Sequence, residues 1–269
     1  MTDYKKKSKE IRKKIVEITS TCGGHIASSF SYVDILVAIY YGKIFKHKPE
    51  KPDWQGRDKF ILSKGHGETA LFTVLSDLKY FPETWLNEHY RRGNCYLGGH
   101  PDHKIPGVEI SSGALGQGLG IASGIALASK KENKKNYHYV LMGDAECTEG
   151  SVWEASLFAA KHKLNNLIAI IDYNKIGSID FIENFTSIAP FKDKWEAFGW
   201  EVLEIDGHNF KEIISALKYS KKRKKSSPLA IIAHTIKGKG VSFIENDPAW
   251  HVKKLSTTDE INKALFELK

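Results

Sequence analysis

The residues best suited to chemistry lie near the middle of the sequence, around an aspartate and an asparagine. The segment 143–150 (GDAECTEG) contains Asp144, and Asn174 follows thirty positions later in the segment 172–176 (DYNKI). A carboxylate, an amide oxygen and a backbone carbonyl would form an oxygen-donor site suited to Mg²⁺ or Ca²⁺. The same two residues could instead cap a helix and shape a turn. On this motif alone, both interpretations stay open.

The pattern around the motif predicts that neighbouring strands bring these two side chains together. Residues 137–142 and 167–171 are short apolar runs typical of buried strands, and residues 151–164 between them predict a helix. Strand, helix and strand in this order form a βαβ unit, in which the strands run parallel. Asp144 and Asn174 would then follow the carboxyl ends of adjacent strands, where α/β proteins bind ligands.

Apolar runs and spacing predict the remaining elements. Strands are expected at 59–62, 200–205 and 229–233, and helices at 8–20, 32–41, 69–78, 121–129 and 210–219. The helix at 151–164 carries Trp153, Leu157, Ala160 and Leu164 on one face. No internal repeat or low-complexity linker divides the chain, so we expect residues 1–269 to form one α/β domain, a mainly parallel sheet flanked by helices.

The aspartate and asparagine pattern resembles the diphosphate-and-metal signature of thiamine-diphosphate enzymes. Four further motifs narrow the resemblance to transketolases: 24–28 (GHIAS), 63–67 (SKGHG), 99–101 (GHP) leading to 112–118 (SGALGQG), and 237–240 (KGKG) followed by 250–251 (WH). They occur in the order found in that family and extend from His25 to about Lys253. The chain is therefore identified as similar to transketolases over nearly its whole length.

This resemblance implies the thiamine-diphosphate-binding fold, in its diphosphate-side domain, and a cofactor pair of thiamine diphosphate and Mg²⁺ (or Ca²⁺). The implied metal ligands are Asp144, Asn174 and the backbone of Ile176, completed by diphosphate oxygens and water. The implied cofactor-binding residues are Ser28, Lys64, His66, Gly113, Ala114, Leu115, Gly143, Asp144, Ala145, Glu149, Asn174 and Lys237.

Four histidines stand beside glycine, proline or tryptophan in the motifs named above. Imidazoles suit ketol transfer because near neutral pH they can donate, accept or carry a proton. In transketolases the histidines matching His25 and His251 act on the substrate carbonyl and its proton movements, and that matching His100 binds the terminal hydroxyl of the donor. The resemblance therefore makes His25, His100 and His251 catalytic and places His66 beside the diphosphate.

The glycine-rich segment before the helix at 121–129 is not a dinucleotide motif. Ile121 occupies the last glycine position of G-x-G-x-x-G, so the resemblance instead places residues 113–115 against the thiazolium and aminopyrimidine rings. Ala145 replaces the glycine usual after the metal aspartate, which would restrict the loop if the backbone there needs positive φ. Glu149 either interacts favourably with the dipole of the following helix or, as the resemblance implies, joins a carboxylate network between subunits.

The chain departs from the family in length. A complete transketolase is more than twice as long and adds a pyrimidine-binding domain, which carries the catalytic glutamate, and a C-terminal domain. We therefore expect an N-terminal subunit that transfers a two-carbon ketol unit from a ketose to an aldose only with a complementary C-terminal subunit, in a heterotetramer with two copies of each. One alternative is another thiamine-diphosphate enzyme, either the α-type subunit of a 2-oxo acid dehydrogenase or a deoxyxylulose-phosphate synthase; both would share the metal signature but not the set of His25, His100 and His251. The other is a non-catalytic module that kept the fold.

Composition limits the partners and the location. The formal net charge is +8, but the basic residues concentrate at 5–14 and 221–225 and are expected to be solvated, so we expect no nucleic-acid partner. Cys22, Cys95 and Cys147 form no C-x-x-C pair, which argues against a disulfide framework and fits a reducing cytoplasm. The longest apolar stretch, 35–41, is too short to span a bilayer.

Overall fold

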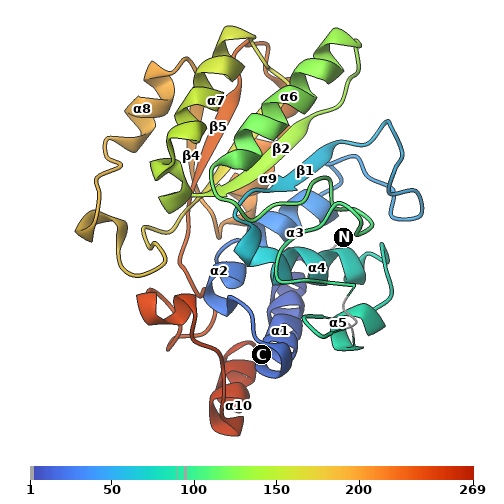
Figure 1. Ribbon diagram of the computed structural model, residues 1–269, viewed down its shortest axis with the longest axis vertical. Coiled ribbons are helices and arrows are strands. Elements are labelled where there is room, and N and C mark those ends of the chain that lie inside the picture. The colour runs from blue at the N-terminus through green and yellow to red at the C-terminus, as the bar shows by residue number, and fades with distance from the viewer. Residues whose placement is uncertain (1–2, 89, 94–95) are drawn as a thin grey trace.

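The computed structural model describes residues 3–88, 90–93 and 96–269, and its centre is a parallel sheet with helices on both faces (Figure 1). Within the described residues the strands are β1 (Lys59–Leu62), β2 (His138–Gly143), β3 (Leu167–Tyr173), β4 (Glu201–Asp206) and β5 (Leu229–His234). They pair in the order β1-β2-β3-β5-β4, and every pair is parallel. The predicted α/β class with a mainly parallel sheet is confirmed.

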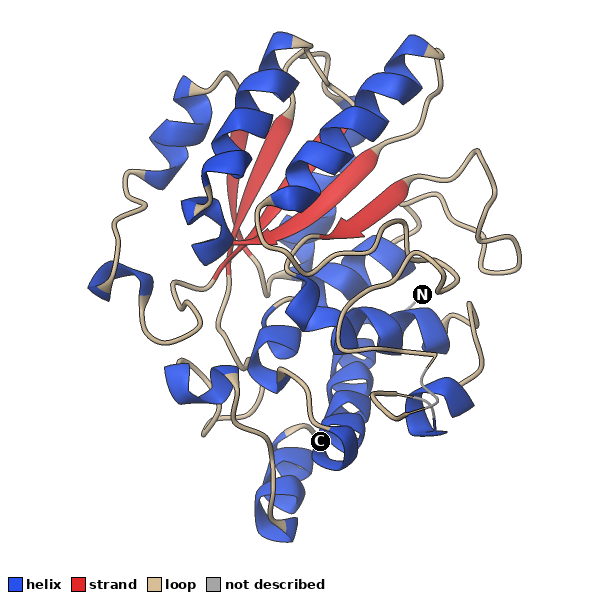
Figure 2. Cartoon of the chain, in the orientation of Figure 1, coloured by secondary structure: helices blue, strands red, loops and turns tan. Residues whose placement is uncertain are grey.

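Helices cover the sheet in unequal layers. The helices are α1 (Tyr4–Cys22), α2 (Ile26–Ser31), α3 (Val33–Tyr41), α4 (Glu68–Asp77), α5 (Thr84–Glu88), α6 (Gln117–Lys131), α7 (Gly150–Lys161), α8 (Phe191–Ala197), α9 (Phe210–Lys222) and α10 (Thr258–Glu267). Helices α6, α7 and α8 lie on one face, and α3 and α9 lie on the other, where α1 and α4 pack against α3. Figure 2 shows the strands converging toward the centre, where loops separate the sheet from α1, α2 and α10.

The alternation of side chains along each strand explains the two layers. Phe60 and Leu62 of β1 belong to the cluster that includes α1, α3, α4 and α9, whereas Ile61 belongs to the cluster with α6, α7 and α8. Successive strand residues point to opposite faces, so a strand that is apolar throughout must be covered on both sides. The core therefore fixes the strands rigidly and leaves their carboxyl ends to carry polar groups.

Helix α7 buries only part of the face predicted from its sequence, because Trp153 and Ala160 pack against the core but Leu157 does not. Its buried residues are Val152, Ala155, Ser156 and Ala159, whereas Leu157 is 58 % exposed. Small side chains face inward because α6 and α7 lie close together over the sheet. Leu157 and Phe158 consequently point outward, whereas Trp153 packs against Trp195 in the core.

Several boundaries differ from the sequence-based expectation. Helix α6 begins at Gln117, so Gly118 and Gly120 lie inside the helix and do not lead into it. Helix α9 continues to Lys222, and part of the basic run 221–225 is helical. Helix α1 extends over Tyr4–Cys22 and buries Ile11, Ile15 and Ile18 as a stripe, as their spacing suggests.

No described helix has the length and apolar character required to cross a bilayer. Cys22 and Cys147 are free thiols, and Cys95 lies outside the described residues.

Candidate functional site

A cavity of about 230 Å³ opens at the carboxyl edge of the sheet. Residues directly after β1, β2 and β3 reach it, as do residues of α2 and of the chain after β5. Its lining includes Ser28, Lys64, His66, Leu115, Gly143, Asp144, Ala145, Glu149, Asn174, Ile176, Lys237 and His251. Segments far apart in the sequence therefore bring most of the expected site residues to one place.

Asp144 follows β2 directly and is almost completely buried. Its Oδ1 accepts a hydrogen bond from the Ala145 N–H (2.8 Å), and its Oδ2 accepts one from the Lys175 N–H (2.5 Å). The first contact is a cap, as the simpler interpretation expects, and the second joins the loop after β2 to the loop after β3. Burial, and next the charge of Asp172, raises the pKa of Asp144 to about 7. A cation bound at this position would stabilise the charged form of the Asp144 carboxylate.

The loop after β3 supplies further oxygen atoms. Asn174 Oδ1 accepts from the Ile176 N–H (3.0 Å), and Lys237 Nζ donates to the carbonyl oxygens of Ile176 (3.3 Å) and Gly177 (2.7 Å). A positively charged group already contacts the Ile176 carbonyl, so this oxygen can serve a cation. The described residues hold no group of three or more His, Cys, Asp or Glu side chains arranged for a metal, but a set of one carboxylate, one amide and one carbonyl fits Mg²⁺ with ligand oxygens completing it.

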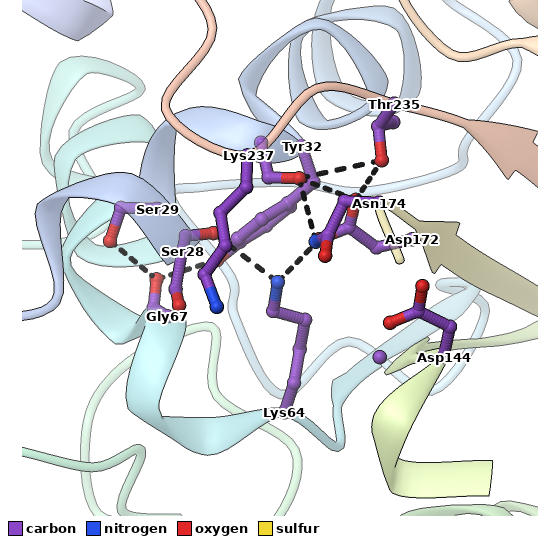
Figure 3. Close-up of polar contacts among 12 residues, drawn as sticks. Ser28, Ser29, Tyr32, Lys64, Gly67, Asp144, Asp172, Asn174, Thr235 and Lys237 are labelled. Atoms are coloured by element: carbon purple, nitrogen blue, oxygen red, sulfur yellow. Dashed lines mark hydrogen bonds and ion pairs between the residues drawn. The ribbon is translucent and has the colours of Figure 1, made fainter. Parts of the chain in front are cut away.

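A buried ionic network lies behind the cavity. The carboxylate of Asp172, the penultimate residue of β3, pairs with the ammonium of Lys64 and also accepts from Thr235 Oγ1 and from Ser31 Oγ (2.6 Å). Asn174 Nδ2 donates to the same carboxylate (3.2 Å), as Figure 3 shows. Burial alone would raise the pKa of Asp172, but the Lys64 ammonium holds it below its usual value. The network fixes Lys64 and Asn174 in position.

Three imidazole rings pack edge to face or tilted beside the cavity. The ring centroids of His25, His66 and His251 are 5.3 Å (His25 to His66), 5.2 Å (His25 to His251) and 5.2 Å (His66 to His251) apart. Burial, and next the charge of Arg91, lowers the pKa of His25 to about 4, and burial with the charge of Lys237 lowers that of His251 to about 3. Both rings are therefore neutral at pH 7, so each has one ring nitrogen without a proton.

The fourth histidine, His100, packs against the glycine-rich segment at Gly113. A Cβ added at Gly113 would come within 2.6 Å of His100 Cδ2, and the φ of Gly113 is +151°. Only glycine lets the backbone pass this close to the ring. Burial, and next Arg91, lowers the pKa of His100. Ala114, beside Gly113, is exposed, so residues 113 and 114 border the cavity mouth but do not line it.

Two carboxylates near the cavity have different environments. Glu149 is exposed and makes no capping hydrogen bond to α7. Glu146 is buried and accepts from Ser63 Oγ, from the Gly116 N–H (2.9 Å) and from the Gly143 N–H (3.1 Å). Glu146 therefore ties together the loops after β1 and β2 and the start of α6.

Asp172 and Glu146 were not among the residues predicted from the sequence. Asp172 stands two residues before Asn174, so strand alternation could have placed both on one side of β3. Its main partner, Lys64, lies 108 positions earlier, and no local pattern indicates that pairing. Ala145 lies in a short 3₁₀ helix (Ala145–Thr148) and is not among the residues with positive φ, so replacing glycine there causes no backbone strain.

A larger hollow of about 660 Å³ adjoins the site and shares Asn174 with it. It is lined by the loop after β3 and by the end of β5, including Phe181, Ile188, His234 and Thr235. Most of the predicted metal-binding, cofactor-binding and proton-transfer residues line the smaller cavity, so we place the candidate site there.

Comparison with known proteins agrees with this geometry. Residues 5–267 match the family model described as transketolase, thiamine diphosphate binding domain. An apulose-4-phosphate transketolase subunit from Actinobacillus succinogenes is 43 % identical, over 99 % of this chain and 96 % of that protein. The 6-deoxy-6-sulfo-D-fructose transketolase subunit SqwG of Clostridium sp. is 40 % identical, over 97 % of this chain and 94 % of that protein.

A solved structure shows the same fold. Transketolase from Campylobacter jejuni superposes with a TM-score of 0.92 at 31 % identity, and the match covers 100 % of this chain but 43 % of that one. The chain thus corresponds to a part of a single-chain transketolase and to nearly the whole of the transketolase subunits. Its parallel sheet, the polar groups at the carboxyl edge and these matches together show that the chain belongs to the transketolase family, as its thiamine-diphosphate-binding domain.

Proposed function

We propose that this chain is the N-terminal subunit of a transketolase that binds thiamine diphosphate with Mg²⁺ and transfers a two-carbon ketol unit from a ketose to an aldose. The observation that supports this most is that His66 and His251 line the same cavity as Asp144 and Asn174, and that the His25 ring packs against both of these imidazoles. Proton-transfer groups and a cation site thus border one space, as ketol transfer requires.

The resemblance to transketolases assigns each group a role that agrees with its surroundings. Asp144, Asn174 and the Ile176 carbonyl would hold the metal, and Lys64, Lys237 and His66 would face the diphosphate. Bound thiamine diphosphate would supply a nucleophilic carbon that can add to a carbonyl group. Neutral His25 and His251 would accept or return a proton at the substrate carbonyl and hydroxyl groups, and His100 would bind the terminal hydroxyl of the donor.

A second chain is part of this proposal. Ile179 (79 % exposed) and Phe185 (47 % exposed) lie in the loop after β3 that borders the cavity. Exposed apolar groups beside a site suggest a covering partner, and a complementary C-terminal subunit would also supply the pyrimidine-binding domain and the catalytic glutamate. A cytoplasmic location belongs to the proposal as well, because the described cysteines are free thiols.

A further exposed surface supports pairing of two N-terminal subunits. We define the α6–α7 face by Gly120, Ile121 and Gly124 of α6 and Leu157 and Phe158 of α7, all of which are exposed. A Cβ at Gly124 would meet no atom within 4 Å, so packing within this chain does not require glycine there. Close approach of a second copy would explain both the glycines and the apolar side chains, and would give a heterotetramer of two copies of each subunit.

The test is reconstitution with a transketolase C-terminal subunit. The mixture should transfer a two-carbon unit from a ketose to an aldose in the presence of thiamine diphosphate and Mg²⁺, whereas each chain alone should not. Transfer by this chain without a partner would contradict the split-enzyme proposal. Cofactor binding without transfer in the mixture would favour a non-catalytic module, and decarboxylation of a 2-oxo acid by the mixture would favour the α-type subunit.

A further inference from the structure

His208 connects the β-sheet edge to the segment that delivers Lys237. It follows β4 in the turn before α9 and is only 13 % exposed at its side chain. Its Nε2 lies 2.9 Å from the backbone nitrogen of Ile236, and its Nδ1 lies 2.7 Å from Asp34 Oδ2. A backbone N–H can only donate, so Nε2 must accept and the ring proton must sit on Nδ1. The contacts therefore fix one tautomer of His208.

A buried ion pair fixes the orientation of the Asp34 side chain. Asp34, in the first turn of α3, accepts two hydrogen bonds from the guanidinium of Arg12 in α1, at 3.0 and 2.8 Å. Arg12 also donates to the Phe30 carbonyl (3.1 Å). A bidentate pair of this kind holds both side chains in one geometry. The Arg12–Asp34 pair therefore orients the imidazole of His208 through Asp34 Oδ2.

The residue that His208 holds lies between two residues that contact the site. Thr235 donates to the carboxylate of Asp172, and Lys237 Nζ contacts the Gly177 carbonyl and His251 Nδ1 (3.0 Å). The segment is held again at Gly238, whose N–H donates to the Ala27 carbonyl (3.0 Å). Between these anchors, the contact of His208 with the Ile236 N–H takes the place of a strand partner, because β4 ends at Asp206.

The turn before His208 is built for this close approach. A Cβ added at Gly207 would lie 2.4 Å from Thr235 Cγ2 and 3.1 Å from the His234 carbonyl oxygen. Gly207 N–H donates to that carbonyl (2.8 Å). The absence of a side chain at Gly207 thus lets the turn pack against the end of β5, where His208 can reach Ile236.

We infer that His208, oriented by Asp34 and Arg12, is a positioning residue that sets the backbone of Ile236 and thereby the place of Lys237 in the candidate site. The inference rests on the proposed function for its effect on cofactor binding, but the contact itself is independent of that function. His208 touches neither the cavity nor its expected contents and acts through the segment 235–238.

Three variants separate positioning from general stability. His208→Ala removes both contacts, whereas His208→Gln offers an amide nitrogen to Asp34 and an amide oxygen to the Ile236 N–H. His47→Ala is the matched control, because His47 is also partly buried and makes two hydrogen bonds, to Tyr80 and to the Tyr40 carbonyl, far from the site. Thiamine diphosphate with Mg²⁺ is titrated by calorimetry into the complex reconstituted with the C-terminal subunit, and backbone amide exchange of residues 235–240 is followed by mass spectrometry without ligand.

His208→Ala should weaken cofactor binding at least about tenfold, the lower end for groups that orient ligating residues, and should speed exchange at 235–240. His208→Gln should retain most of the affinity and the slow exchange. His47→Ala should lower thermal stability but change neither measurement. Unchanged exchange at 235–240 in His208→Ala would overturn the inference, as would equal affinity in His208→Ala and the wild type.

Asp34→Asn gives a second test that leaves the shape almost unchanged. An amide that keeps its oxygen toward Arg12 presents its nitrogen to His208, and the ring must then carry its proton on Nε2, facing the Ile236 N–H. This mismatch should also speed exchange at 235–240, and no change there would contradict the assigned tautomer. If the wild type binds no thiamine diphosphate at all, the proposed function fails, whereas the exchange measurements still decide the role of His208.

Discussion

Charges within the candidate site are only partly neutralised by one another. Asp172 is paired with Lys64, but Asp144 has backbone N–H partners and no cationic one among the described residues. Burial, and next the charge of Lys64, lowers the pKa of Lys237 to about 7. Burial disfavours the charged forms of Asp144 and Lys237 in the ligand-free protein. The Asp144 carboxylate and the Lys237 ammonium are therefore suited to bind a cation and an anion together, such as a metal diphosphate.

Asp144→Ala is therefore expected to weaken Mg²⁺-dependent binding of thiamine diphosphate at least about tenfold, because losses of 10–100-fold follow even from changes to groups behind metal ligands. Calorimetric titration with and without Mg²⁺ measures this. Asp53→Ala, at an exposed aspartate away from the site, should bind normally. Unchanged affinity in Asp144→Ala would remove Asp144 from the metal site.

The histidines proposed to act in catalysis should behave differently from Asp144. His25→Ala, His100→Ala and His251→Ala should each keep cofactor binding and lose roughly 10²–10⁴ in turnover, the range for a general acid or base. Rates are measured in the enzyme reconstituted with its C-terminal subunit, with exposed His162→Ala as the control. Normal turnover in two of the three variants would show that the substrate lies elsewhere.

Elements of the sheet show what the sequence could and could not predict. The strands and their common carboxyl edge were predictable because apolar runs bounded by polar motifs mark buried parallel strands. The outward face of α7 could not be predicted, because α7 has apolar residues on two sides and its sequence does not reveal which side meets the sheet. Only the packing of α6 against α7 decides that Ala155 faces in and Leu157 faces out.

The same limit applies to the candidate site. Motifs next to strand ends predicted Asp144, Asn174 and Lys64 as site residues, and all three line one cavity. Contacts between distant segments, such as Lys64 with Asp172 or His208 with Ile236, depend on the three-dimensional register of the chain. Local spacing contains no information about these contacts, so Asp172 and His208 were missed.

Strand β2 carries a buried histidine, His138, that lowers the stability of the fold at acidic pH. Neither ring nitrogen of His138 has a hydrogen-bond partner among the described residues, and the residue is fully buried. Burial, and next the charge of Lys59, lowers its pKa to about 4. The unfolded chain takes up the proton near the ordinary pKa of about 6.5, whereas the folded chain resists it. Stability from this group is therefore complete above about pH 6.5 and is lost as the pH falls toward 4.

His138→Val, which suits a strand interior, should remove this dependence. Between pH 7 and pH 5 the wild type should lose about 2 kcal/mol of unfolding free energy through His138, from the linkage of one such group, and the variant should not. Urea unfolding at both pH values compares them. Equal losses in the two proteins would show that His138 is not the source.

At the scale of the whole molecule, a substitution in the α6–α7 face should affect the folding stability of the chain and its proposed pairing with a second copy in opposite directions. Glycine inside a helix costs up to about 1 kcal/mol relative to alanine, and a Cβ at Gly124 has open space. Gly124→Ala should thus stabilise the isolated chain by about 0.5–1 kcal/mol and yet weaken its pairing with a second copy. Denaturant unfolding and light scattering after size-exclusion chromatography measure the two effects.

Gly118→Ala is the contrasting variant on the same helix. Its Cβ would lie 2.2 Å from Ser63 Oγ, so this change should destabilise the fold itself. If Gly124→Ala assembles as tightly as the wild type, the α6–α7 face is not where two copies meet.

The wide spacing of the three packed imidazoles along the chain has a consequence for biosynthesis. His25 leaves the ribosome more than two hundred residues before His251, a delay of roughly 10–45 s at ordinary rates of synthesis. During that interval the amino-terminal helices can form, but the rings of His25 and His66 lack the third ring against which they pack. A diphosphate ligand in the cell therefore meets no finished site on the nascent chain, and can act on this protein only after its last strand and the segment beyond it have been made.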